Sequence, residues 1–202
     1  MRQILTSKNV LITLFMGIFM SGSAFADGDI EAGKIKAYTC TGCHGIPGYN
    51  NAYPTYKVPK IGGQNYAYLM SAMKAYKNGE RDHATMENHA ISLNDKDIED
   101  ISAYFASLPL SPQDNSNAGE GHEKAKVCEA CHGVTGKSVD PTFPNLAGQH
   151  ASYLAQALGD YRSGARTNPV MAGMAANLSN QDIKDLAAWF ASQQGLQDLS
   201  IK

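Results

Sequence analysis

The chain has 202 residues, with 17 basic and 19 acidic side chains and a formal net charge of −2 at pH 7. A slightly acidic chain lacks the positive field that nucleic-acid binding needs, so we exclude nucleic acid as a partner. There are four cysteines, and their spacing in the sequence indicates their function.

Residues 1–26 are predicted to be a cleaved export signal. Arg2 and Lys8 give a positive start, an apolar run of 11 residues extends from Val10 to Met20, and Ala-Phe-Ala at 24–26 fits a cleavage site. The run is too short for a bilayer, which needs about 20 residues, and no later stretch is apolar enough to span one. We expect a mature protein of residues 27–202 with 15 basic and 19 acidic side chains, a net charge of −4.

One five-residue pattern, Cys-x-x-Cys-His, occurs twice and uses every cysteine of the chain. The pattern is typical of covalent c-type haem attachment. Each thiol adds to one vinyl group of the porphyrin, and the histidine that follows can bind the iron from one side. The sequence therefore predicts two covalently bound haems c. The attachment residues are Cys40, Cys43, Cys128 and Cys131, and the proximal iron ligands are His44 and His132.

Other uses of paired cysteines fit less well. The two pairs of a four-cysteine zinc site usually lie about 15–20 residues apart, whereas 84 residues separate Cys43 from Cys128. A thioredoxin-like motif needs no histidine and belongs near a βαβ pattern, which is absent. Two disulfides are conceivable in an oxidising compartment. None of these alternatives explains a histidine at the same place in both copies.

The mature chain is an internal repeat. From Gly63-Gln64, which matches Gly148-Gln149, the two halves align at a constant offset of 85 residues. The haem motifs are offset by 88, so the first half has three extra residues, which fall in the Tyr-rich loop 48–60. The polar segment 109–119, with two prolines, is expected to be a linker. It separates an N-terminal domain, residues 27–108, from a C-terminal domain, residues 120–202.

Helical signals dominate both halves. Asn94 is a predicted N-cap, and an apolar stripe with helical spacing follows it; Ser179 begins the equivalent helix. Further helices are expected over 65–78 and 150–163, and over 31–38 and 120–127, which lead into the haem motifs. No segment alternates as a strand would. We predict an all-α protein of two tandem domains related by the internal repeat.

A second axial ligand to each iron should occur in both halves. Met86 and Met171 occupy matching places, whereas Met174 matches His89. Methionine opposite histidine is the usual ligation of carrier cytochromes. The alternatives are that both methionines only fill gaps in the core, or that His83 or His89 binds the iron.

Residues of three other kinds are candidates for the haem pockets. Pro59 and Pro144 stand at matching places, where a proline carbonyl can orient the ligand histidine. Gln64, Gln149, Arg81 and Arg166 either pair with haem propionates or are surface caps.

With these residues in place, the chain resembles the cytochromes c4, dihaem members of the class I c-type cytochromes. The resemblance covers the mature chain and rests on the CTGCH and CEACH motifs, on the Gly-Gln after each, and on the segment from each methionine to the last helix. It implies an all-α fold of two tandem class I cytochrome c domains packed through a pseudo-twofold interface. It also implies periplasmic electron transfer, often loosely at the membrane, with His44 and Met86 on one iron and His132 and Met171 on the other.

We therefore expect an electron carrier between a quinol-oxidising complex and a terminal oxidase. One alternative is the dihaem cytochrome subunit of a flavin dehydrogenase. Another is a dihaem enzyme, such as a peroxidase or a thiosulfate-oxidising cytochrome. A peroxidase needs an iron with a coordination position that is open or can open, but both halves have a methionine at the matching place. A Cys-ligated catalytic haem needs a fifth cysteine, which the chain lacks.

Overall fold

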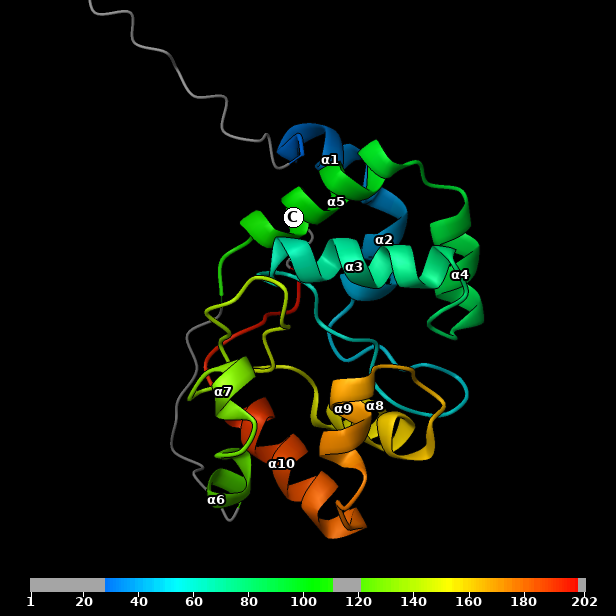
Figure 1. Ribbon diagram of the computed structural model, residues 1–202. Coiled ribbons are helices and arrows are strands. Elements are labelled where there is room, and N and C mark those ends of the chain that lie inside the picture. The colour runs from blue at the N-terminus through cyan, green and yellow to red at the C-terminus, as the bar shows by residue number, and fades with distance from the viewer. Residues whose placement is uncertain (1–27, 111–120, 200–202) are drawn as a thin grey trace, which may run out of the picture.

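The computed structural model describes residues 28–110 and 121–199, and every regular element within them is an α-helix, as predicted (Figure 1). The predicted signal and most of the predicted linker lie outside the described residues. The helices of the first half are α1 (Ile30–Lys36), α2 (Tyr38–His44), α3 (Tyr66–Lys77), α4 (Ala84–Ile91) and α5 (Asp95–Ser107). Those of the second half are α6 (Gly121–Ala125), α7 (Glu129–His132), α8 (Ala151–Ser163), α9 (Pro169–Ala175) and α10 (Asn180–Ser192).

The two halves repeat one packing scheme. In the first half, α5 packs on α1 and α3, and α3 packs on α4. In the second half, α10 packs on α6 and α8, and α8 packs on α9. Figure 1 shows the two helical groups one above the other, joined by irregular segments. The internal repeat therefore corresponds to two copies of one helical unit.

A glycine sets the closest contact between helices in each unit. A Cβ on Gly33 of α1 would lie 1.9 Å from the carbonyl oxygen of Asp100 in α5. A Cβ on Gly121 of α6 would lie 2.3 Å from that of Asp185 in α10. Only glycine allows backbones to approach this closely. The first helix of each unit is thereby held against the last, with the haem motif directly after it.

The cap signals at the last helix of each half are confirmed. Asn94 and Ser179 each form a capping box with the aspartate three residues later. The sequence did not indicate α4 and α9, which carry the candidate methionines. His83 and Asn168 cap them through side chains that accept from the N–H groups of Met86 and Met171. These helices have eight and seven residues, too few for periodicity to reveal.

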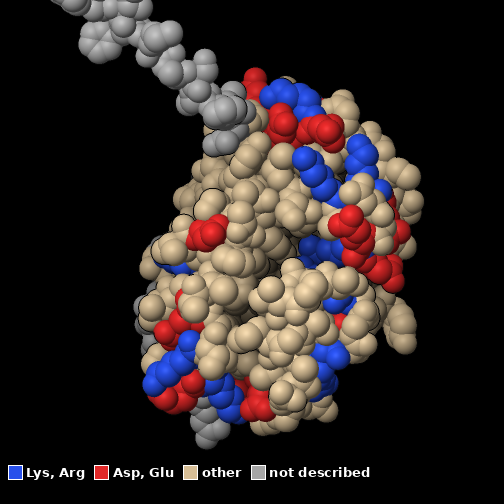
Figure 2. All heavy atoms as spheres, viewed as in Figure 1, with Lys and Arg blue, Asp and Glu red and all other residues tan. Residues whose placement is uncertain are grey.

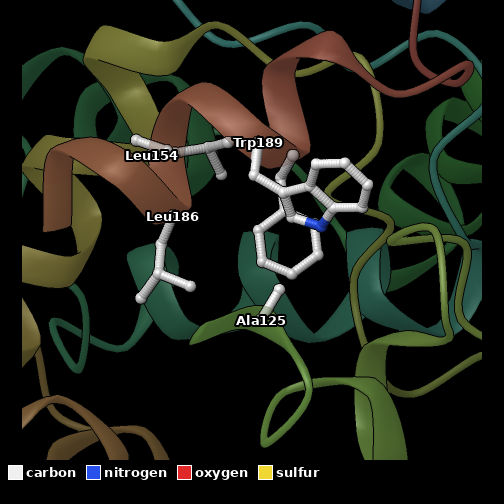
Figure 3. Packing of buried hydrophobic residues seen from close by; sticks show 6 residues of the cluster. Ala125, Leu154, Leu186 and Trp189 are labelled. Atoms are coloured by element: carbon white, nitrogen blue, oxygen red, sulfur yellow. The ribbon is translucent and has the colours of Figure 1, made fainter. Parts of the chain in front are cut away.

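Each half has a small apolar core of its own. In the second half, Trp189 and Leu186 of α10 pack against Leu154 of α8 and Ala125 of α6 (Figure 3). In the first half, Ile101 and Phe105 of α5 take part in the equivalent cluster. A unit of this size buries little apolar surface, so a bound porphyrin adds substantially to each core.

The C-terminal segment crosses from the second half to the first. Gln197 forms an isolated antiparallel bridge with Gly62, and Leu199 is buried in the core of the first half. Figure 1 shows this red segment running from the lower group of helices toward α3. Leu196, three residues earlier, is buried and bonded to Ala147 of the second half. The last described residues therefore join the two units.

No helix among the described residues is long and apolar enough to cross a membrane.

We predict that Leu199→Ala destabilises the first half although the residue belongs to the last segment of the chain. Truncating a buried leucine costs about 2–5 kcal/mol. Hydrogen exchange should show the lost protection in α1, α3 and α5. Val139→Ala, at a side chain that is 94% exposed, is the control and should be neutral. Lost protection confined to α8 and α10 would contradict the prediction.

A buried carboxylate, Asp100, ties α1 to α5 and makes the fold sensitive to acid. It accepts from the backbone N–H of Asp29 at 2.6 Å, from Lys36 at 2.8 Å and from Lys96 at 2.7 Å. These donors, the backbone N–H first, hold the pKa of Asp100 well below its ordinary value. Its contribution to stability is therefore present above an unfolded-state pKa of about 4 and is lost as the pH falls further.

We predict that Asp100→Asn lowers stability at neutral pH and flattens its decline between about pH 4 and pH 2. Urea unfolding at a series of pH values measures this. Asp82→Asn, at an exposed side chain, is the control. An unchanged slope in the Asp100 variant would refute the assignment.

Candidate haem-binding sites

The first haem motif lies on α2 and opens into a pocket. Cys40, Cys43 and His44 line this pocket together with Met86 from α4. The remaining wall is partly apolar and includes Met73, Leu93 and Ile101. Two free thiols, an imidazole and a thioether around one partly apolar cavity are the groups that a covalently bound c-type haem requires. The residues present therefore fit the group.

Both motif histidines are oriented by a proline carbonyl, as predicted. The Nδ1 of His44 lies 2.7 Å from the carbonyl oxygen of Pro59. The Nδ1 of His132 lies 3.0 Å from that of Pro144. A carbonyl oxygen only accepts, so each Nδ1 carries the proton and each Nε2 keeps a free lone pair. Burial lowers the pKa of both imidazoles, which favours this neutral form.

The candidate methionines lie at equivalent places on α4 and α9 and are half-buried, whereas Met174 is 41% exposed. His83 is not a free loop residue. Its Nδ1 accepts from the N–H of Met86 at 3.3 Å and caps α4. His89 is exposed, yet it also lines the pocket that contains Met86.

The two glutamines that the sequence left open are not surface caps. Gln64 and Gln149 are each 4% exposed, and each amide bonds both backbone groups of a residue in the other half. Gln64 donates to the carbonyl of Asn145 at 3.0 Å and accepts from its N–H at 2.8 Å. Gln149 donates to the carbonyl of Lys60 at 2.8 Å and accepts from its N–H at 2.9 Å. The pattern is reciprocal, as a pseudo-twofold axis requires.

The glycine before each glutamine holds the turn. Gly63 and Gly148 have φ of +79° and +74°, which favours glycine, and each donates its N–H to the last helix of its own half. The recurring Gly-Gln dipeptide thus attaches to its own unit through glycine and to the other unit through glutamine.

The two arginines meet between the halves and also contact the opposite half. Arg81 donates to the hydroxyl of Tyr153 at 2.8 Å, and Arg166 donates to that of Tyr68 at 3.2 Å. Arg166 also lies 3.5 Å from the Tyr153 hydroxyl. Burial disfavours the phenolate of Tyr153, but the two guanidiniums outweigh it and lower its pKa to about 8.

Neither guanidinium forms an ion pair with a carboxylate in the part of the chain that the structure describes. The nearby carboxylate of Asp160 accepts instead from Gln156 at 2.7 Å. Two half-buried cations around one phenol leave a local excess of positive charge. The arginines and tyrosines therefore form a site that suits carboxylates.

The Tyr-rich loop that carries the three extra residues also reaches the second half. The N–H of Lys57 donates to the Ser152 hydroxyl at 3.0 Å. The rings of Tyr56 and Tyr153 lie 6.2 Å apart. The three extra residues of the first half thus lie in a loop that contacts the second half.

The sequence model of the cytochrome c family matches twice, at residues 30–109 and 117–194. A cytochrome c4 of Pseudomonas aeruginosa is 36% identical over 94% of this chain and 99% of its own length. The crystal structure of a reduced cytochrome c4 from Pseudomonas stutzeri superposes with a TM-score of 0.70 at 35% identity, covering 82% of this chain and 99% of that chain.

The chain belongs to the cytochrome c4 family. Its two CxxCH motifs bind two haems c covalently, and it is a dihaem electron-transfer protein.

Two matches of lower sequence identity are named after thiosulfate dehydrogenase. A thiosulfate dehydrogenase electron acceptor of Stutzerimonas stutzeri is 28% identical over 77% of this chain and 79% of its own length. A thiosulfate dehydrogenase structure from Marichromatium purpuratum matches at 27% identity with a TM-score of 0.67, covering 81% of this chain and 40% of that chain.

Sequence reasoning missed the contacts between halves because they involve residues about 80–90 positions apart in the chain. The constant offset of the repeat shows which residues are equivalent. It does not show that a glutamine of one copy reaches a loop of the other.

Proposed function

We propose that this cytochrome c4 is a periplasmic electron carrier in which His44 and Met86 bind one iron and His132 and Met171 bind the other. The observation that carries the proposal is the pocket in which the thiols of the first motif, His44 and Met86 meet. The repeat extends the same ligands to the second half. When bound, each haem supplies a redox-active iron, and the chain supplies its ligands, its apolar surroundings and its orientation.

An iron held on both sides has no open position for a substrate, so this ligation suits relay of electrons. Methionine opposite histidine also favours ferrous iron and raises the potential. The chain thereby suits acceptance of electrons from a quinol-oxidising complex and their delivery to a terminal oxidase.

The arginines and tyrosines between the halves support exchange of electrons between the haems. Haem propionates are carboxylates, and Arg81 and Arg166 are positioned to bind them with Tyr68 and Tyr153 at their sides. Figure 2 shows Lys or Arg atoms set back in the surface where the two halves meet. Both haems would then direct their propionate edges to one region.

Docking of redox partners is proposed at a largely uncharged surface. On the face in Figure 2, charged side chains gather toward the ends and the right-hand edge of the molecule, and uncharged residues cover much of the middle. Such a surface favours brief contacts with partner proteins, including partners at the membrane. Export by the predicted signal, residues 1–26, would bring the chain to the periplasm.

A second candidate function is acceptance of electrons from a thiosulfate-oxidising enzyme. It is favoured by the relatives described as thiosulfate dehydrogenase electron acceptors. This role uses the same two haems and differs only in the donor. A dihaem subunit of a flavin dehydrogenase would likewise leave the site unchanged.

We predict that Met86→Ala and Met171→Ala each free one coordination position on one of the two irons. Each variant should bind CO at that haem and lose its share of the Met-to-iron charge-transfer band, because the sulfur ligand is gone. Met174→Ala is the matched control and should change neither property. If Met174→Ala opened an iron and Met171→Ala did not, the ligand assigned in the second half would be wrong.

We predict that the isolated protein equilibrates electrons between its haems and turns over no substrate. Stopped-flow reduction with a donor that reacts at one haem should show rapid redistribution to the other. Redistribution should be independent of protein concentration, because it occurs within one molecule. Steady consumption of peroxide or thiosulfate by the isolated chain would refute the carrier function.

A further inference from the structure

The two interface glutamines act on the peptide groups that hold the haem histidines. The carbonyl of Pro59 accepts from His44, and the N–H of Lys60 donates to Gln149. This carbonyl and this N–H belong to one planar peptide unit, because the carbonyl carbon of residue 59 is bonded to the nitrogen of residue 60. Gln149 of the second half is therefore one peptide away from a histidine of the first.

The opposite half repeats the arrangement. The carbonyl of Pro144 accepts from His132, and the N–H of Asn145 donates to Gln64. Each glutamine also donates to the carbonyl of the same residue, so the loop is held at two points. Both amides are buried, so water does not compete for these bonds.

We propose that Gln149 positions and polarises the peptide that orients His44, and that Gln64 does the same for His132, so that each half tunes the iron ligand of the other half. This inference rests on the proposed function, in which both histidines are iron ligands. Gln64 and Gln149 are positioning residues, because neither touches the metal ligand itself.

The physical basis is cooperativity of hydrogen bonds along the peptide. A peptide whose N–H donates to an acceptor becomes more polarised, and its carbonyl accepts more strongly. A stronger bond from the histidine Nδ1–H makes the imidazole a better electron donor to the metal. A better donor stabilises ferric iron, so loss of the glutamine bond should raise the reduction potential of the haem in the other half.

The two loops do not depend on their glutamines equally. The side chain of Asn145 makes its own bonds, since it accepts from Ser138 at 3.0 Å and donates to Gly63 at 3.1 Å and to Asn65 at 3.3 Å. Within residues 28–110 and 121–199, the side chain of Lys60 has only an ion pair with Asp198, at 3.9 Å. The loop at His44 should therefore depend more on Gln149 than the loop at His132 depends on Gln64.

The test is a pair of reciprocal variants in the full-length dihaem protein, Gln149→Met and Gln64→Met. Methionine keeps the length of the side chain and removes all its hydrogen bonds. The readouts are the potential of each haem and the NMR resonances of each axial histidine. The spectral changes of Met86→Ala and Met171→Ala identify which signal belongs to which haem.

We expect Gln149→Met to shift the reduction equilibrium of the first haem toward ferrous iron by roughly two- to tenfold, the range that one hydrogen bond contributes. The second haem should stay within error of the wild type. Gln64→Met should shift the second haem instead, and by less. Gln193→Met is the control, because Gln193 is also buried and its side chain, among the described residues, bonds only Trp189 and Ser192 of its own half.

Shifts confined to the half that carries the substitution, equal shifts at both haems, or no shift would each overturn the inference. Should Gln149→Met not accumulate with two haems, Gln64→Met carries the test alone, and it must shift the second haem more than the first. Absence of histidine–methionine signals from the wild-type protein would instead refute the proposed function.

Discussion

A porphyrin that is bound through two thioethers, with a ligand histidine directly after the second cysteine, leaves the surrounding chain little conformational freedom. The motif must lie on a short helix whose end faces a cavity, and the imidazole must present Nε2 to that cavity. In both halves the motif histidine ends a short helix, α2 or α7, and a proline carbonyl fixes the imidazole through Nδ1. The helices around them then complete a core that a unit of this size does not complete alone.

The requirement also explains why loops contribute so much to the contact between the two units. The loop that follows each haem motif must be held firmly, because it orients the ligand. Gln64 and Gln149 hold it from the opposite unit through backbone bonds, which depend little on the side chain of the bonded residue. The glutamine bonds are therefore the same although Lys60 stands in one loop and Asn145 in the other.

Local signals predicted much of the fold. The capping residues Asn94 and Ser179 lie where their helices begin, and Ile101 and Phe105 lie in the core. Helices α4 and α9 were not predicted because they are too short for an apolar stripe to be recognised. The partners of the interface glutamines and of Leu199 were not predicted either. Contacts between residues so distant in the chain are set by packing of the units, which no local pattern describes.

Duplication of the unit does not make the two iron sites equivalent. Burial lowers the pKa of both His44 and His132, and the guanidinium of Arg81 lowers that of His44 further. His83 and His89 have no histidine counterpart in the second half, where Asn168 and Met174 occupy their places. Helix α4 is therefore capped by an imidazole and α9 by an amide, and the pocket that contains Met86 has an imidazole, His89, where the matching place holds Met174. The repeat thus supplies two similar ligand sets, and the few positions at which its copies differ set them apart.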